Sequence, residues 1–451
     1  MNRKTLIAGL LFAGLILAAV LLLRSPEKGT RSAGEAPRPI AKLTDNSFDT
    51  LDVTKNKVTT TLKKEGDAYR IVKPVAYAAD KELAKTAFDA IAKMDFDNII
   101  SDQKGRHTEF EVGDDGLRVV VKKGDKVLAD FRLGKSANQF TMLRIEGKDE
   151  VWAATNILKY QLDKTTTDWR DKTITSFDEK DAEKLQVSGK DGAKIMLTKP
   201  APTDAGAANT DWQVVESTVK VEPYDKSVAN GMAAQLASWK TNEFADSTKP
   251  EETGLDSPEL TVTVGLRNGK QQTVLVGKKK GDDDYYVKLA DSPQVFLVKK
   301  YNIDRVNKRP IEFRDKTLCN LKSEEVTEIA VTREKDSYTL AKQGSAWKLI
   351  KPAGVTLDDS KVSNITSAFS ELKGQSFAED NSPKATGLAK PTAGIAVKSS
   401  VKGHTCQLKV GSETSDKSGY YVQAGGMTYV SVVNKWAIDR VLVKLDDLKK
   451  K

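Results

Sequence analysis

Apolar and polar residues alternate in short stretches along most of the chain, and one such stretch occurs twice. Residues 61–74 read Thr-Leu-Lys-Lys-Glu-Gly-Asp-Ala-Tyr-Arg-Ile-Val-Lys-Pro, and residues 339–352 repeat this pattern of apolar, turn-forming and Lys-Pro positions. A weaker copy lies between them, in residues 196–199 and 211–215. In each full copy, two β-forming stretches flank a Gly-containing turn, which predicts a β-hairpin. The sequence therefore predicts three tandem repeats.

A helix is predicted after each hairpin, because apolar residues recur there at three- and four-residue steps. An aspartate that can cap the helix precedes each periodic segment: Asp80, Asp225 and Asp358. The predicted buried faces are Ala84, Ala87, Ile91 and Met94, then Ala229, Met232, Leu236 and Trp239, then Val362, Ile365, Phe369 and Leu372. The residue types change from copy to copy while the face stays apolar, which indicates core packing rather than a ligand site.

Further strands with Gly-containing turns follow each helix, and the second of them ends in an aliphatic residue and a glycine. We expect these glycines, Gly134, Gly277 and Gly411, to turn the backbone through positive φ. Strand-rich repeats with one principal helix and short hairpin links predict an α+β fold, with a mainly antiparallel sheet in each repeat. The predicted repeats span residues 43–173, 174–317 and 318–451.

Residues 6–23 form an uninterrupted apolar run that is long enough to span a bilayer as a helix. The run fits an uncleaved anchor or a cleavable signal peptide; the distance to the small residues Gly34 and Ala36 favours the anchor. We therefore predict a membrane anchor in residues 1–24. The next segment, residues 25–42, is rich in Pro, Gly, Ser and charges, and we predict a flexible spacer there.

Basic residues around the apolar run give conflicting indications of orientation. More of them follow the run than precede it, and by simple count this excess favours a cytoplasmic body. A short basic segment before an N-terminal apolar run is instead typical of a start-transfer signal, and long domains cross membranes largely regardless of charge. We expect a single span in the inner membrane with most of the chain outside the cytoplasm.

The net charge and the cysteine count exclude several classes of function. The net charge of +9 is spread along the chain, with Lys alternating with acidic residues, so no nucleic-acid partner is predicted. The two cysteines, Cys319 and Cys406, are too few for a disulfide framework or a cysteine metal site. One bridge between them stays open, but Cys406 is in phase with Leu408 and Val410 on a strand, which favours a small buried residue.

Residues for catalysis or metal binding are scarce. His107 and His404 fall in no ligand spacing, and both are predicted at the surface. Residues 134–136, Gly-Lys-Ser, lack the leading glycine of a phosphate loop, and residues 281–284 lack the ligand ladder of a calcium loop. We therefore predict no enzyme, no catalytic residue, no cofactor and no metal.

An aromatic-Arg-Asp-Lys motif ends each of the first two repeats. It consists of Trp169, Arg170, Asp171 and Lys172, and of Phe313, Arg314, Asp315 and Lys316. It is missing from residues 445–448, which read Leu-Asp-Asp-Leu. We predict a structural joint in which the aromatic packs between repeats and Arg pairs with Asp. Binding of an anionic ligand by the two arginines is the alternative.

These features resemble a bacterial family of unknown function, the domain of unknown function numbered 4340, over residues 43–451. The resemblance rests on the aromatic-x-x-x-Lys-Pro edge, the Asp-capped helix, the Tyr-Tyr-Val strand, the joint motif, and the Thr-Gly-Leu segments at 253–255 and 386–388. The first repeat departs from the pattern, with His-Thr-Glu at 107–109. The resemblance implies tandem copies behind a membrane helix and an accessory role beside gliding-type ABC transporters; it supplies no catalytic residues.

Two hypotheses of function follow. The leading one is a membrane-anchored extracytoplasmic scaffold or accessory subunit, whose partner is a transporter permease or ATPase complex. The second is a cell-wall or glycan-binding module that uses Tyr285, Tyr286, Tyr420 and Tyr421 as platforms. Neighbouring tyrosines on a strand face opposite ways, so at most one of each pair is available.

Overall fold

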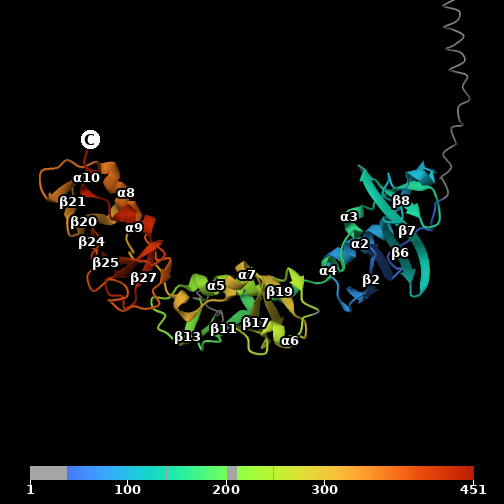
Figure 1. Cartoon of the computed structure of the whole chain (residues 1–451), viewed down its shortest axis with the longest axis horizontal. Coiled ribbons are helices and arrows are strands. Elements are labelled where there is room, and N and C mark those ends of the chain that lie inside the picture. The colour runs from blue at the N-terminus through green and yellow to red at the C-terminus, as the bar shows by residue number, and fades with distance from the viewer. Residues whose placement is uncertain (1–37, 138–139, 201–210, 247, 451) are drawn as a thin grey trace, which may run out of the picture. The chain divides into compact units, whose positions relative to one another are not determined.

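The computed structural model describes residues 38–137, 140–200, 211–246 and 248–450 (Figure 1). These residues form two compact units that divide between Lys172 and Thr173. The predicted anchor at residues 6–23 lies outside the described residues. Among the helices that are described, none is long and apolar enough to cross a membrane.

Three large sheets carry the fold, one in the first unit and two in the second, and the strands in all of them pair antiparallel. The first sheet has the order β4 (Tyr77–Ala78), β3 (Ala68–Lys73), β2 (Val58–Glu65), β1 (Thr50–Lys55), β6 (Leu117–Lys123), β7 (Lys126–Ala137), β8 (Phe140–Ile145), β9 (Val151–Thr155) and β5 (Asp95–Ser101). The second has the order β13 (Gln213–Ser217), β12 (Lys194–Thr198), β11 (Ala182–Gly189), β16 (Leu260–Leu266), β17 (Gln271–Lys280), β18 (Asp284–Leu289), β19 (Phe296–Lys299) and β15 (Glu243–Phe244). The third has the order β22 (Ala346–Lys351), β21 (Tyr338–Gln343), β20 (Val326–Thr332), β24 (Ala393–Ser399), β25 (Thr405–Glu413), β26 (Gly419–Ala424), β27 (Ser431–Asn434) and β23 (Ser376–Phe377).

The three orders are the same once the short edge strand β4 is set aside, so the predicted repeated α+β fold with mainly antiparallel sheets is confirmed. The strand that comes first along the chain in each large sheet, β1, β11 or β20, was not revealed by the sequence and lies in the middle of its sheet. In β1, Leu51 pairs with Leu62 of the neighbouring hairpin on one side and with Val121 of β6 on the other. A further two-stranded sheet joins β10 (Thr173–Ser176) to β14 (Ser238–Lys240).

One principal helix packs on each sheet: α2 (Lys81–Lys93), α5 (Lys226–Ala237) and α8 (Asp359–Ser370). The predicted caps are confirmed; the Asp80 carboxylate accepts hydrogen bonds of 3.1 Å from the backbone N–H groups of Glu82 and Leu83. The predicted apolar faces are all buried. Each helix face joins the inward residues of its own sheet in one core, so every repeat has a separate core.

Two short elements end each repeat. A short helix follows the last long strand of the sheet: α3 (Lys159–Leu162), α7 (Lys300–Val306) and α9 (Lys435–Val441). A closing turn comes next: α4 (Thr166–Trp169), the 3₁₀ turn Pro310–Phe313 and α10 (Leu445–Leu448). One more single turn, α6 (Pro250–Thr253), precedes β16 in the second repeat.

The end of the predicted spacer packs on the first repeat, which corrects its boundary at residue 42. The Arg38 guanidinium lies 2.8 Å from the Asp95 carboxylate, and Ile40 packs against the first core. The folded part therefore begins no later than Arg38. The remainder of the predicted spacer, residues 25–37, lies outside the described residues.

The expectation that three strand glycines have positive φ is wrong, because the backbone at Gly134, Gly277 and Gly411 does not enter that region. Their role is to allow a close approach of another backbone segment. A Cβ atom there would lie 1.9, 2.1 and 2.1 Å, respectively, from the carbonyl oxygens of Phe110, Thr253 and Thr386. No side chain fits at such a distance, so glycine is required at these positions.

The approaching segment contains the residue that does have positive φ. This residue is Gly254 (φ 67°) in the second repeat and Gly387 (φ 70°) in the third. In the first repeat it is Glu111 (φ 58°), directly after Phe110. Residues 110–112 therefore correspond to Thr-Gly-Leu, and our placement of residues 107–109 there was wrong by three positions.

Candidate functional site

The joint motif closes each repeat on itself, and our expectation that its aromatic packs between repeats is wrong. Trp169 and Phe313 are fully buried in the cores of their own repeats. Their carbonyl oxygens accept hydrogen bonds of 2.8 Å from the backbone N–H groups of the helix caps Asp80 and Asp225. Leu448 is equally buried and accepts the same bond from Asp358, at 2.9 Å. The third repeat thus has its closing turn, with leucine in place of the aromatic.

The charged residues of the first joint stay close to the first repeat. The Arg170 guanidinium is buried and lies 4.2 Å from the centre of the Tyr77 ring. The Asp171 backbone N–H donates to the carbonyl of Ala78 at 2.9 Å. The Lys172 ammonium lies 3.8 Å from the Asp168 carboxylate, one helical turn earlier. These contacts continue the closing turn.

The second joint does reach the neighbouring repeat, within the second compact unit. The Arg314 guanidinium lies 4.7 Å from the ring centre of Tyr429 and 5.7 Å from that of Phe377, and its Nε donates to the Lys220 carbonyl at 2.7 Å. Burial lowers the pKa of Arg314. In the described part of the chain Arg314 forms no ion pair with Asp315, whose carboxylate instead accepts from a backbone N–H at 2.8 Å. The predicted Arg–Asp pair is therefore wrong for this joint. Lys316 contributes its carbonyl, which accepts from the Gly374 N–H at 2.7 Å.

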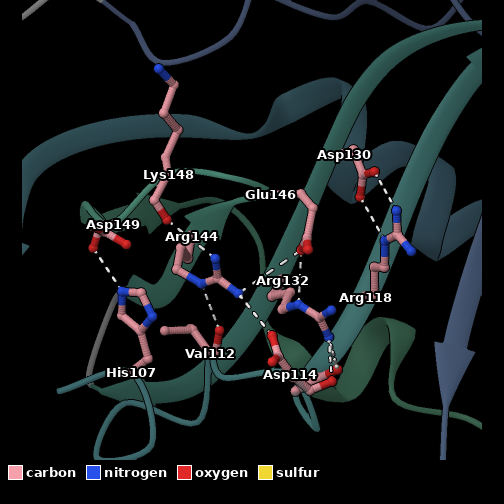
Figure 2. A network of polar contacts seen from close by, with 11 residues as sticks. His107, Val112, Asp114, Arg118, Asp130, Arg132, Arg144, Glu146, Lys148 and Asp149 are labelled. Atoms are coloured by element: carbon pink, nitrogen blue, oxygen red, sulfur yellow. Dashed lines mark hydrogen bonds and ion pairs between the residues drawn. The ribbon is translucent and has the colours of Figure 1, made fainter. Parts of the chain in front are cut away.

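A polar network occupies one end of the first sheet (Figure 2). Arg132 of β7 and Arg144 of β8 are cross-strand partners, and both side chains are about nine-tenths buried. Arg132 Nε donates to the Glu146 carboxylate at 2.9 Å and its Nη1 to the Asp114 carbonyl at 2.6 Å. Arg144 Nε donates to the Val112 carbonyl at 2.8 Å. The guanidinium groups therefore hold the segment around residues 110–116 on the sheet.

This network stabilises the first repeat, because its two buried guanidinium groups are hydrogen-bonded to groups of the same repeat. The guanidinium groups of Arg132 and Arg144 donate to backbone carbonyls and to the Glu146 carboxylate, and Figure 2 also shows Arg118 paired with Asp130. The equivalent cross-strand pairs are Leu275 with Lys288 in the second repeat and Lys409 with Gln423 in the third. Neither pair could make the same bonds, so the network is not part of a function shared by the repeats.

The cysteines and histidines depart from expectation in two places. Cys319 and Cys406 form a disulfide, with Cα atoms 5.4 Å apart, which corrects the preference for a free buried thiol. The predicted alternation on the strand was right, because Cys406 is buried, but it could not reveal the partner. His107 is also buried, and its Nε2 lies 2.8 Å from the Asp149 carbonyl, so its predicted surface position is wrong. His404 is half-exposed.

None of the four tyrosines proposed as glycan platforms, Tyr285, Tyr286, Tyr420 and Tyr421, is fully exposed. Tyr286 is buried, and Tyr285 and Tyr420 pack against the cores of their repeats. Among the described residues, the exposed aromatics are Tyr160, Tyr301 and Trp436, with exposed fractions of 66%, 57% and 58%.

All three exposed aromatics occupy the second position of the short helix, after a lysine. The signal in the sequence is a Lys-aromatic-x-aliphatic pattern that recurs at 159–162, 300–303 and 435–438. Core packing cannot explain an aromatic that is retained on the surface three times.

A groove of about 760 Å³ lies beside Tyr301 in the second repeat. Its walls come from α5, from α7 and from the segments that follow these two helices. It is lined by Ser227, Val228, Gly231, Ala234, Gln235, Ser238, Lys240, Thr241, Asn242, Tyr301, Asn302, Arg305 and Lys308. We call it the α5–α7 groove. Three of these residues are cationic and none is acidic. Among the described residues, no three His, Cys, Asp or Glu side chains gather as metal ligands.

The chain belongs to the family described as Domain of unknown function (DUF4340), which matches it three times, over residues 70–258, 212–391 and 347–451. The matches begin at the same structural position in each repeat, within β3 and β22 and directly before β13. The resemblance noted in the sequence is therefore confirmed. No curated protein matches the chain.

Two solved structures illustrate what else aligns with the chain. A DNA polymerase sliding clamp from Pseudomonas aeruginosa has 8% identity and a TM-score of 0.12, with 86% of this chain and 92% of that chain covered. A Helicobacter pylori beta clamp has 7% identity and a TM-score of 0.13, with 86% and 91% covered. Similarity this weak carries no argument about fold or function.

Proposed function

We propose that this protein is a membrane-anchored scaffold or accessory subunit that acts outside the cytoplasm, beside a transporter of the gliding-type ABC class. The apolar run at residues 6–23 supports the anchor, since it has the length and the basic flank of an N-terminal span. Membership of DUF4340 agrees with tandem units of this kind. The transporter association rests on the resemblance described above.

The disulfide is the observation that carries the extracytoplasmic placement. Cys319 and Cys406 are the only cysteines in the sequence, and both are buried in the core of the third repeat. Disulfides of this structural kind persist in oxidising compartments and are rare in the reducing cytoplasm. A body that is exported behind an N-terminal span would form this bridge.

A scaffold role is supported by what the repeats have in common. The positions that recur are core residues, helix caps, close-approach glycines and closing turns, all of which stabilise the fold. The recurring surface feature is an exposed aromatic on the short helix, which suits contacts with other molecules. We therefore propose a binding role without enzymatic activity.

The experiment is affinity purification of the tagged full-length protein from its native membranes after mild crosslinking, with mass spectrometry of the bound proteins. We expect a transporter permease and its ATPase to be enriched over a control in which residues 6–23 are replaced by a cleavable export signal. Protease added to intact spheroplasts should digest the body. Recovery of neither transporter component, or a body protected from the protease, would overturn the proposal.

A further inference from the structure

The α5–α7 groove contains cations without acidic partners. In the part of the chain that the structure describes, Lys240, Arg305 and Lys308 form no ion pair, and the side-chain contact of Arg305 is a hydrogen bond of 3.2 Å to the Gln235 amide oxygen. The nearby Asp304 is already paired with Lys300, at 2.6 Å. A surface with three unpaired cations and no carboxylate is complementary to an anion.

The third repeat shows what an equivalent surface looks like when its charge is neutralised. Arg440 takes the position of Arg305, because each lies five residues after the lysine that begins its short helix. Glu371 takes the position of Ser238, because each lies thirteen residues after its helix cap. Arg440 pairs with Glu371 at 3.2 Å. The serine at position 238 therefore leaves Arg305 available.

The other groove residues suit a polar ring-shaped ligand. The amide side chains of Asn242 and Asn302 make no hydrogen bond among the described residues, and each can donate and accept. Tyr301 presents an exposed aromatic face, on which the C–H face of a sugar ring can pack. Gly231, which also lines the groove, has open space beside it, since a Cβ atom there would meet nothing within 4 Å.

We infer that the α5–α7 groove binds an acidic saccharide, meaning a sugar that carries carboxylate or phosphate groups. Lys240, Arg305 and Lys308 would bind the acid groups, the asparagines the hydroxyls, and Tyr301 the ring face. An acidic peptide fits less well, because Val228 and Ala234 offer little apolar surface for side-chain anchors. The inference does not depend on the membrane anchor or on a transporter partner.

The test measures binding of oligogalacturonate and of a phosphomannan oligosaccharide to the purified full-length protein by calorimetry at low salt, with neutral maltohexaose as the comparison. Two variants address the groove. Ser238→Glu gives Arg305 the partner that Arg440 has, and Tyr301→Ala removes the ring. We expect each to weaken binding at least about tenfold, and Ser238→Glu to reduce the dependence of affinity on salt by about one ion.

Matched controls are available in the other repeats. Tyr160→Ala removes the equivalent exposed aromatic, and Ser370→Glu adds the same charge at the surface end of α8. Both should leave binding within about twofold, and circular dichroism should show all four variants folded. Phosphatidylglycerol vesicles, which carry phosphate without a sugar ring, test whether the groove binds a membrane surface instead of a saccharide.

Each result of this binding experiment either supports or overturns the inference of a saccharide site. Binding of either acidic oligosaccharide that is lost in both groove variants and kept in both controls supports the inference, whether the natural source is a free polymer or a glycolipid headgroup. The inference is overturned by absence of binding to both oligosaccharides, by equal binding of maltohexaose, or by equal losses in groove and control variants. Stronger binding to the vesicles than to either sugar would also overturn it, in favour of a membrane surface.

Discussion

Replacing Gly134 by alanine should destabilise the first repeat, because the new Cβ atom would lie 1.9 Å from the Phe110 carbonyl oxygen. Contacts of this kind are not found below 3.0 Å, so the segment that contains Phe110 would have to move by about 1 Å. Arg132 and Arg144 hold that segment through its carbonyls, and Phe110 accepts a hydrogen bond from the Lys135 N–H. Overpacking and the loss of about one hydrogen bond together amount to about 2–4 kcal/mol.

Hydrogen exchange with mass spectrometry of the full-length protein is the suitable assay, because it reports on each repeat separately. Gly134→Ala should speed exchange in peptides of β7 and β8 and leave the third sheet unchanged. Gly105→Ala is the control, since a Cβ atom there meets nothing within 4 Å and the backbone φ is not positive; its effect should stay within about 0.5 kcal/mol. Equal effects of the two substitutions would refute the close-approach argument. Gly277→Ala and Gly411→Ala should act in the same way on their own sheets.

Two further predictions concern buried polar groups. Arg144→Met leaves two backbone carbonyls without their donor in a site where the side chain is 8% exposed, so we expect a loss of about 2–4 kcal/mol in urea unfolding. Arg118→Met removes an ion pair that is 40% exposed on the arginine side and should cost less than about 1 kcal/mol; similar losses for both would contradict this reasoning. Burial raises the pKa of Tyr338 to about 12, whereas a tyrosine in the unfolded chain ionises near pH 10. The stability that comes from keeping this phenol protonated in the folded protein is therefore complete below pH 10. It declines by roughly 2 kcal/mol as the pH rises towards 12. Tyr338→Phe should flatten the fall in unfolding free energy over that range, and an unchanged slope would count against the assignment.

Local sequence patterns were sufficient for the principal helices, for their buried faces and for the first hairpin. The apolar steps that end in Ile91, Leu236 and Phe369 mark faces that are buried, because a helix repeats its geometry every few residues whatever its tertiary contacts. The hairpin around Gly66 could likewise be predicted from its turn chemistry.

Features that depend on distant contacts could not be predicted in this way. The central strand β1 pairs with β6 across a long stretch of sequence, and no local pattern specifies that partner. Leu448 takes the place of Trp169 at the closing turn of the third repeat. The equivalence could not be seen from residue type, because only the position and its backbone hydrogen bond are the same. The α5–α7 groove could not be predicted from the sequence, because Ser238 and Arg305 line one groove only when α5 packs on α7.

The closing turn also sets the order in which the repeats can finish folding during synthesis. Trp169, Phe313 and Leu448 are the last core residues of their repeats, and the carbonyl of each accepts a hydrogen bond from the backbone N–H of the aspartate that caps the helix of the same repeat. The first two repeats can therefore complete their cores while later segments are still being made, since domains fold as units from the N-terminus. A nascent chain that stops before Leu448 would carry two finished repeats and a third with an open core, and that third repeat would be the first target of quality-control proteases.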